Sequence, residues 1–290
     1  VGTEVAWNYC EQLNLPRLIV INKMDRQNAN FAKTYAALEE FSDTRLIKFN
    51  LPIGEKEDYK GTIDLISMKA FLGNDKAGTE IPAEYKDEAE TERMVLIEAA
   101  AEGDDVLLEK YLESGELSAE EIKTGLQGVI KDGTFIPVLV AAAGSELGLA
   151  PVLSAIADYI PSPLEATPRK GMAKDSEIEL KAEDSGPLAC YVWKTTADPF
   201  VGKQTFFRVF SGSVSSDSKP WNSTKEIEER FGSVAIMRGK DSETIDVIHA
   251  GDIGSDDILT ELGVIAPTVA VSGNMDRGSV ASKLKERLDF

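Results

Sequence analysis

Residues 18–21 form a short apolar run, Leu-Ile-Val-Ile, in which three of the four side chains are β-branched. Such a run predicts a buried strand of a parallel sheet, because β-branched side chains pack well on a surface that helices cover on both faces. The run leads directly into Asn22-Lys23-Met24-Asp25. Open α/β sheets hold their ligands at the loops that leave the carboxyl ends of the strands. The sequence therefore predicts a ligand site at this turn.

The residue types in the turn suit a guanine base. The carboxylate of Asp25 can accept hydrogen bonds from guanine N1–H and from the exocyclic amine, a donor pair that adenine lacks. The amide of Asn22 can bond both the base and a neighbouring loop, and the aliphatic part of Lys23 can lie along the ring. By itself the pattern is weak, since about one chain in thirty of this length contains it by chance. The alternative is a surface turn with solvated charges, and the preceding strand argues against that alternative.

Composition bounds the class of protein. A length of 290 residues with 42% hydrophobic content predicts two domains with real cores. The two cysteines, Cys10 and Cys190, provide no disulfide or metal framework and fit a reducing compartment. Because no apolar run reaches membrane-spanning length and no secretory signal pattern occurs, we expect a cytoplasmic protein without a membrane partner. The net charge of −19 argues against a large nucleic-acid-binding surface but leaves room for a local basic patch.

The first 163 residues alternate between helical and extended patterns, which predicts an α/β core. Apolar residues at helical spacing predict helices at 3–13, 31–41, 84–112, 118–130 and 149–159. Apolar β-branched or aromatic runs predict strands at 18–21, 46–53, 62–70 and 135–142. Ser118 and Glu121 have the spacing of a capping box at the start of one of these helices.

From residue 187 onward the hydrophobic period changes from 3.6 to 2, which predicts an all-β module, an incomplete barrel. The expected strands are 188–196, 204–211 and 244–249. Residues 164–186 are polar and interrupted by proline and glycine, so we expect a linker with an edge strand.

Several segments together resemble elongation factor G and its close relatives, the ribosomal translocation GTPases. They are NKMDR at 22–26, LPIG at 51–54, GTIDLISMKA at 61–70, EKYLESGELSAEEIK at 109–123, DYIPSP at 158–163 and TADPFVGKQTFFRVFSG at 196–212. The resemblance implies a GTPase-type α/β core at 1–163 with a helical insertion at about 44–133. It further implies the linker at 164–186 and a β-barrel second domain at 187–254.

The resemblance also implies site residues. Asn22, Lys23 and Asp25 match the guanine-recognition residues of the family. A second guanine loop usually carries Ser-Ala, whose backbone amide donates to guanine O6; the matching residues are Ala142 and Ala143. The donor of Ala143 survives the change of side chain. The missing serine hydroxyl is expected to weaken the support of the loop.

The implied cofactor is GTP or GDP, with Mg²⁺ in the complete family protein, and the implied partners are the ribosome and ribosomal RNA, met by a monomer. No G-x-x-x-x-G-K-[ST] phosphate loop and no residues for Mg²⁺ occur in the 290 residues. The chain is therefore expected to be a piece that does not hydrolyse GTP alone. The only histidine, His249, is expected to be structural.

Residues 198–211 interleave phenylalanines with Lys203 and Arg208. Aromatic and basic side chains in such an arrangement can stack on RNA and reach its phosphates. The alternative is that the phenylalanines fill the core of the barrel, since successive strand residues face opposite sides.

The tail from Ser255 has a different pattern: a helix start, a strand at 268–271 and a loop. Residues 244–282 resemble the middle of calcineurin-like metallophosphoesterases, which implies metal ligation by Asp252 and Asn274. The other ligands of that family, an Asp-x-His and several histidines, are absent, so we expect no metal site. We expect a mosaic whose tail is poorly packed and supplies no strand to the barrel.

Three functions remain open at this point. The first is a guanine-nucleotide-binding translation factor of the elongation factor G type. The second is a metal-dependent phosphodiesterase, which rests on the tail alone. The third is a non-enzymatic module that binds the ribosome or RNA through the β domain.

Overall fold

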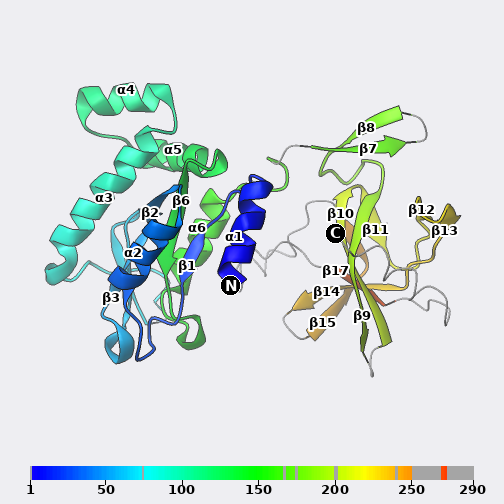
Figure 1. Cartoon of the computed structure of the whole chain (residues 1–290), viewed down its shortest axis with the longest axis horizontal. Helices are drawn as coiled ribbons and strands as arrows, with labels where there is room; N and C mark the ends of the chain where they lie inside the picture. Colours follow the sequence, from blue (N-terminus) through cyan, green and yellow to red (C-terminus); the bar gives the residue numbers. More distant parts are fainter. Residues whose placement is uncertain are drawn as a thin grey trace. The chain divides into compact units, whose positions relative to one another are not determined.

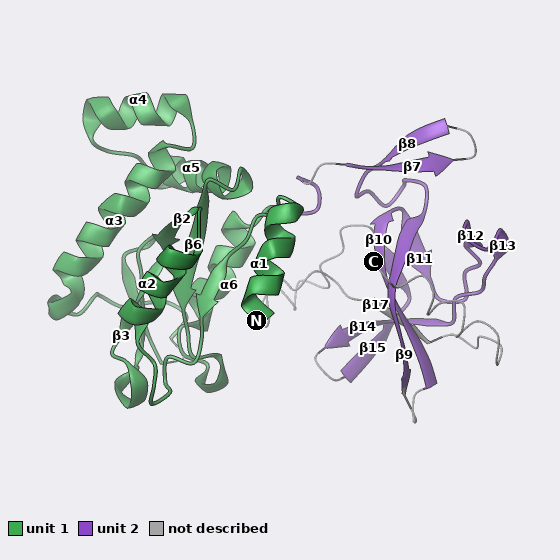
Figure 2. Ribbon diagram, in the orientation of Figure 1, with its two compact units in different colours: residues 1–161, 262–264 green, residues 162–261, 265–290 purple. Residues whose placement is uncertain are grey.

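The computed structural model describes residues 2–73, 75–165, 168–173, 176–198, 202–238, 241–249 and 269–272. They fall into two compact units, unit 1 up to Pro161 and unit 2 from Ser162 (Figures 1 and 2). Among the described residues, no helix combines the length and the apolar character needed to cross a membrane.

Unit 1 is built on a parallel sheet in the order β1-β6-β2, with bounds Ile19–Ile21, Phe135–Val140 and Arg45–Lys48. The central strand β6 is buried along its whole length, as a strand with neighbours on both edges requires. Three helices lie beside this sheet: α1 at Gly2–Gln12, α2 at Phe31–Phe41 and α6 at Leu149–Tyr159 (Figure 1). The predicted α/β alternation is confirmed.

A second sheet in unit 1 is antiparallel, in the order β3-β4-β5, with bounds Asn50–Ile53, Gly61–Asp64 and Lys69–Leu72. The predicted single strand at 46–53 is wrong, because the chain changes sheet at the fully buried Phe49. Its N–H donates to Val138 O at 2.9 Å, and its own carbonyl accepts from Leu65 N–H at 2.9 Å. The predicted strand at 62–70 is likewise two strands, β4 and β5.

The helical part of unit 1 contains α3 at Lys86–Ala101, α4 at Asp105–Ser114 and α5 at Ala119–Lys131. The predicted single helix at 84–112 is wrong because the chain breaks at Gly103 and Asp104. A Cβ on Gly103 would lie 2.3 Å from the carbonyl oxygen of Gly125, so the backbones meet closely there. Asp104 then caps α4 by accepting from Val106 N–H at 2.8 Å.

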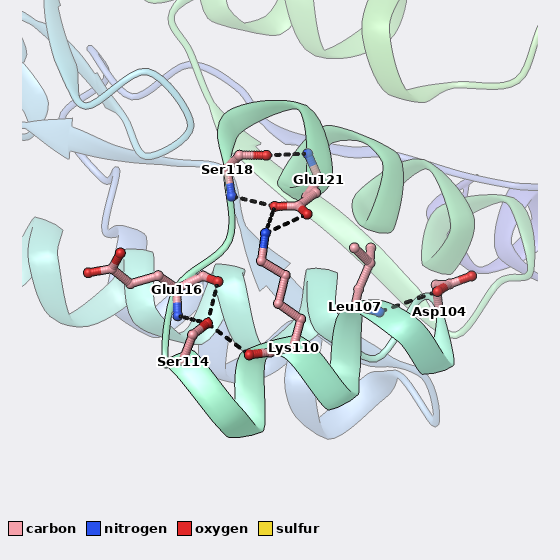
Figure 3. A network of polar contacts seen from close by, with 7 residues as sticks. All are labelled: Asp104, Leu107, Lys110, Ser114, Glu116, Ser118 and Glu121. Atoms are coloured by element: carbon pink, nitrogen blue, oxygen red, sulfur yellow. Dashed lines mark hydrogen bonds and ion pairs between the residues drawn. The ribbon is translucent and has the colours of Figure 1, made fainter.

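The predicted capping box at the start of α5 is confirmed (Figure 3). The Ser118 hydroxyl oxygen accepts from Glu121 N–H at 3.4 Å, and Ser118 N–H donates to Glu121 Oε2 at 2.7 Å. Lys110 of α4 donates to both carboxylate oxygens of Glu121 at 2.7 and 2.8 Å. The bond from Lys110, followed by those from Ser118, lowers the pKa of Glu121 to about 2. One carboxylate thus joins α4 to the first turn of α5.

Unit 2 is all-β. Its largest sheet is antiparallel in the order β15-β14-β17-β10-β9, with bounds Asp241–Ile245, Ser233–Arg238, Val269–Ser272, Gly202–Ser211 and Ala189–Asp198. Two-stranded sheets add β11-β16 at Ser213–Ser215 and Val247–His249, β12-β13 at Trp221–Asn222 and Ile227–Glu228, and β7-β8 at Arg169–Ala173 and Ser176–Leu180. A small core lies among Phe207, Val209, Val214, Val234 and Ile248. The described strands form these separate sheets and not a closed barrel.

Two expectations about strands in unit 2 are wrong in detail. The expected strand at 244–249 is divided between β15 and β16, which belong to different sheets. The segment 164–186, expected to be a linker with one edge strand, contains two antiparallel paired strands, β7 and β8. His249 lies in β16, where it pairs with Ser213.

The strand predicted at 268–271 is confirmed as β17, but the expectation that the tail would supply no strand to the β domain is wrong. Within β17, Val271 pairs antiparallel with Thr205 of β10 on one side and with Val234 of β14 on the other. Main-chain pairing needs only an extended segment, because the unpaired edges of two strands accept almost any third strand. The change of sequence pattern after residue 254 therefore does not prevent a strand of the tail from joining the sheet of unit 2. The helix expected from Ser255 lies outside the described residues.

We expect Val271→Pro to lower the melting temperature of unit 2 by roughly 5–10 °C, because proline removes a ladder N–H from an interior strand. Differential scanning calorimetry of this variant beside Val271→Thr, which keeps a β-branched residue, measures the effect. An unchanged transition in the proline variant would show that β17 does not hold the sheet together.

Candidate functional site

The turn after β1 and the loop after β6 lie next to each other, because the two strands are parallel neighbours. Ile19 pairs with Val138 and Ile21 pairs with Val140, so both chains leave the sheet at the same edge. Beyond the strands, Ala141 N–H donates to Ile21 O at 3.1 Å, and Met24 N–H donates to Ala141 O at 3.3 Å. We call residues 22–26 the guanine turn and residues 142–145 the second loop.

The side chain of Asn22 joins the guanine turn to the second loop. Its Oδ1 accepts from Ala143 N–H at 3.0 Å and from Lys23 N–H at 2.7 Å. Lys23 has φ of +64°, a left-handed conformation that is uncommon for a residue with a side chain. The amide therefore fixes a strained turn, and it does so with the same backbone donor that was expected to face guanine O6.

Asp25 presents a carboxylate at this junction. Its side chain is 24% exposed, and Oδ2 accepts from the hydroxyl of Ser145 at 2.5 Å. Oδ1 lies 3.8 Å from Nε of the exposed Arg26. A carboxylate has further acceptor sites beyond these contacts, so it can receive donors from a ligand.

Sequence reasoning did not select Ser145. It missed the residue because the expected hydroxyl was sought at Ala142, and none is present there. The short 3₁₀ turn Ala143–Ser145 folds the loop back, and Glu146 at φ of +58° completes the bend. A hydroxyl three residues after Ala142 thereby reaches Asp25. The second loop thus contains a hydroxyl contact that the sequence comparison implied was lost.

The five predicted site residues are thus brought to one edge of the sheet. Ala142 is fully buried, and its N–H and carbonyl both pair with Leu147 at 2.9 and 3.2 Å. Ala142 therefore shapes the second loop from the interior. The other four predicted residues lie nearer the surface of unit 1: Asn22, Lys23, Asp25 and Ala143. No group of three or more metal-ligating side chains occurs among the described residues. Asp252 and Asn274 lie outside that part of the chain.

Unit 2 presents an aromatic and basic surface, which we call the β9–β10 face. It consists of Tyr191, Trp193, Lys194, Phe206 and Arg208. Cross-strand pairing places Arg208 beside Tyr191 and Phe206 beside Lys194. The rings of Trp193 and Phe206 lie 5.6 Å apart, and Lys194 Nζ lies 5.8 Å from the Phe206 centroid.

The phenylalanines of β10 divide between two sides, as the alternation of a strand requires. Phe207 is 1% exposed and belongs to the core, whereas Phe206 is half-buried on the β9–β10 face. Phe210 is also half-buried, with the Arg169 guanidinium 4.6 Å from its ring centroid. Phe200 lies outside the described residues.

We expect Asn22→Ala to speed amide exchange at Lys23 and Ala143 by roughly three- to tenfold, because both N–H groups lose their acceptor. Hydrogen exchange followed by NMR measures this. Asn28→Ala, which changes an exposed residue of the same loop, is the matched control. Equal exchange in both variants would contradict a joining role for Asn22.

Two protein families match this chain. The elongation factor Tu GTP-binding domain matches residues 1–162, and elongation factor G domain 2 matches residues 187–258. The second match extends past Asp252, and neither family supports the metallophosphoesterase resemblance of the tail.

One similar solved structure is a protein from Thermus thermophilus, with 27% sequence identity and a TM-score of 0.69. The alignment covers 96% of this chain and 39% of the Thermus chain, so this chain spans well under half of that protein's length. The α/β core followed by a β-rich unit is thus a GTPase-type arrangement. Because the match to the elongation factor Tu GTP-binding domain covers residues 1–162, more than half of the 290, the chain belongs to that family of translational GTPases.

Proposed function

We propose that this chain recognises the guanine base of GTP or GDP as part of an elongation factor G-type protein. In the complete protein, GTP hydrolysis would be coupled to translocation on the ribosome, in the cytoplasm. The observation that carries the proposal is the Asn22–Ala143 bond of 3.0 Å, which holds the guanine turn and the second loop together at the carboxyl edge of the sheet. Ligands bind at that edge in open α/β sheets.

Each residue of the junction has a distinct role in the proposal. Asp25 accepts from guanine N1–H and from the 2-amino group, and adenine leaves this half-buried carboxylate without those donors. Ser145 orients the carboxylate by donating to its other side. The stem of Lys23 covers one face of the ring. Ala143 N–H, which the family resemblance assigns to guanine O6, donates to Asn22 Oδ1 in the structure, so guanine O6 would share this donor with the Asn22 side chain.

Base recognition is the part of nucleotide binding that these residues supply. The phosphates carry most of the charge of a nucleotide, and their usual cradle is a glycine-rich loop at a helix N-terminus. No G-x-x-x-x-G-K-[ST] segment occurs in the 290 residues, and Mg²⁺ would be held with the phosphates.

We expect residues 1–290 to bind GDP more weakly than about 1 μM by calorimetry, with guanine preferred over adenine. Asp25→Asn replaces one acceptor oxygen by an N–H donor. It should therefore shift the base preference from guanosine toward xanthosine diphosphate by about tenfold. Asp43→Asn, a change elsewhere in the same unit, is the control. Sub-micromolar GDP binding would overturn the first expectation, and unchanged base preference in Asp25→Asn would remove Asp25 from the site.

We further propose that the β9–β10 face contacts ribosomal RNA. Tyr191 and Trp193 are 59% and 42% exposed and lie two residues apart on β9, and exposed aromatic side chains gathered in one patch are typical of binding surfaces. Bases can stack on such rings while Lys194 and Arg208 reach phosphates. The net charge of −19 argues against RNA binding over a broad surface, because RNA phosphates repel an acidic protein. A contact with RNA is therefore expected at a local patch with basic side chains, such as the β9–β10 face.

We expect Arg208→Ala to weaken binding to isolated ribosomal subunits by about tenfold. The slope of log affinity against log salt concentration should also become shallower by about one. Filter binding over a range of KCl concentrations measures both. Arg230→Ala is the matched control, because Arg230 is an exposed arginine of unit 2 paired with Asp217 at 2.6 Å. Equal losses for both variants would show that only net charge matters.

A further inference from the structure

The loop Gly54–Tyr59, between β3 and β4, lies against the guanine turn although some thirty residues separate them in sequence. Its main chain bonds the turn, since Lys56 N–H donates to Met24 O at 2.9 Å. One of its side chains bonds the start of the next helix, since Glu55 Oε1 accepts from Phe31 N–H at 2.7 Å. The loop therefore holds the guanine turn at its middle residue, Met24, and holds the chain that follows the turn where α2 begins.

Met24 is fixed from both sides by these contacts. Its N–H donates to Ala141 O at the end of β6, and its carbonyl accepts from Lys56. Its side chain is 1% exposed, so it is also anchored in the core. Met24 lies between Lys23 and Asp25 in the chain. Fixing Met24 therefore limits the positions that the two neighbouring ligand-facing side chains can take.

The loop has a conformation suited to a rigid support. Gly54 has φ of +73°, and a Cβ there would lie 2.1 Å from the carbonyl oxygen of Asp58, so only glycine fits. Lys56 has φ of +57° in a short 3₁₀ turn. The loop is closed at its base by Lys60 N–H, which donates to Ile53 O at 2.9 Å. Both ends therefore continue into the paired strands β3 and β4.

Tyr59 extends this contact toward Asp25 and the start of α6. Its hydroxyl is buried and has no hydrogen-bond partner among the described residues. Burial, and after it the charge of Asp25, raises the pKa of Tyr59. An added Cβ on Gly148, the residue before α6, would lie 3.0 Å from the Tyr59 hydroxyl. Tyr59 thus brings the end of the loop close to the N-terminus of α6.

We propose that Glu55 is a positioning residue for base recognition, which holds the guanine turn, and with it Asp25, in the orientation that guanine requires. The inference rests on the proposed function. A carboxylate bond to a helix N–H is charge-assisted and favoured by the helix dipole. Asn30 Oδ1 accepts from Lys33 N–H at 2.7 Å, and Glu55 accepts from Phe31 N–H, so the two side chains cap different N–H groups in the first turn of α2. The bond from Phe31 to Glu55 therefore ties the start of α2, and the guanine turn before it, to the loop Gly54–Tyr59.

The test compares Glu55→Ala with Glu57→Ala, which removes an exposed carboxylate two residues away in the same loop. Amide exchange of Arg26 and Ala29, whose N–H groups bond within the turn at 3.0 and 2.9 Å, reports on the turn without a ligand. The ratio of GMP to IMP affinity, followed by NMR shifts at millimolar nucleotide, reports on Asp25, because IMP lacks only the 2-amino group.

We expect Glu55→Ala to speed turn exchange by about tenfold and to reduce the GMP/IMP ratio at least about threefold, with Leu139 exchange in β6 unchanged. Glu57→Ala should match the wild type. Glu55→Gln keeps an acceptor oxygen and should retain most of the ratio. If Glu55→Ala loses amide protection at Leu139, the sheet itself is disturbed and Glu55→Gln becomes the test. Its GMP/IMP affinity ratio should then fall only slightly below that of Glu57→Ala.

A failure of the proposed function and a failure of the inference about Glu55 give different results. A wild-type chain that does not distinguish GMP from AMP overturns the proposed function together with this inference. A wild-type chain that prefers GMP, with Glu55→Ala keeping both the turn protection and the GMP/IMP ratio, overturns the inference alone.

Discussion

The parallel pairing of β1 with β6 is the interaction on which the candidate site depends. It brings residues 22–26 and residues 142–145, more than a hundred positions apart, to one edge of one sheet. The Asn22–Ala143 and Asp25–Ser145 contacts then form across that edge. Because β6 is buried along its whole length, the core fixes where the second loop begins, and these two contacts then hold the loop against the guanine turn.

The antiparallel sheet β3-β4-β5 adds a second layer of support behind this junction. Leu51, Ile63 and Leu65 of this region are almost fully buried in the same core as Ile21 and Met24. The loop from Gly54 to Tyr59 therefore projects from a rigid base toward the guanine turn. The site is thus held by two independent chain segments, one following β6 and the other following β3. Sites supported in this way keep the precision that base discrimination requires.

Sequence patterns predicted the elements whose signal is local. The β-branched run gave β1, helical spacing gave α1, α2 and α6, and Ser118 with Glu121 gave the capping box. What they missed depends on contacts between distant segments. Nothing local marks Phe49 as the residue where the chain changes sheet, or Ser145 as the hydroxyl that reaches Asp25. The tail shows the same limit, since β17 pairs with β10 and β14 through main-chain groups that its side-chain pattern does not reveal.

Asn22, Lys23 and Asp25 could be selected as candidate site residues from the sequence because their side chains at that spacing suit a guanine base, and their contacts with guanine stay a prediction. The central claim is that they recognise guanine in this chain together with Ala143. The most direct measurement is an amide-shift titration of residues 1–290 with GMP and with AMP at matched concentrations. The account predicts shifts at Asp25, Ala143 and Ser145 with GMP and much smaller ones with AMP. Equal shifts with both nucleotides, or shifts confined to other parts of the chain, would contradict it.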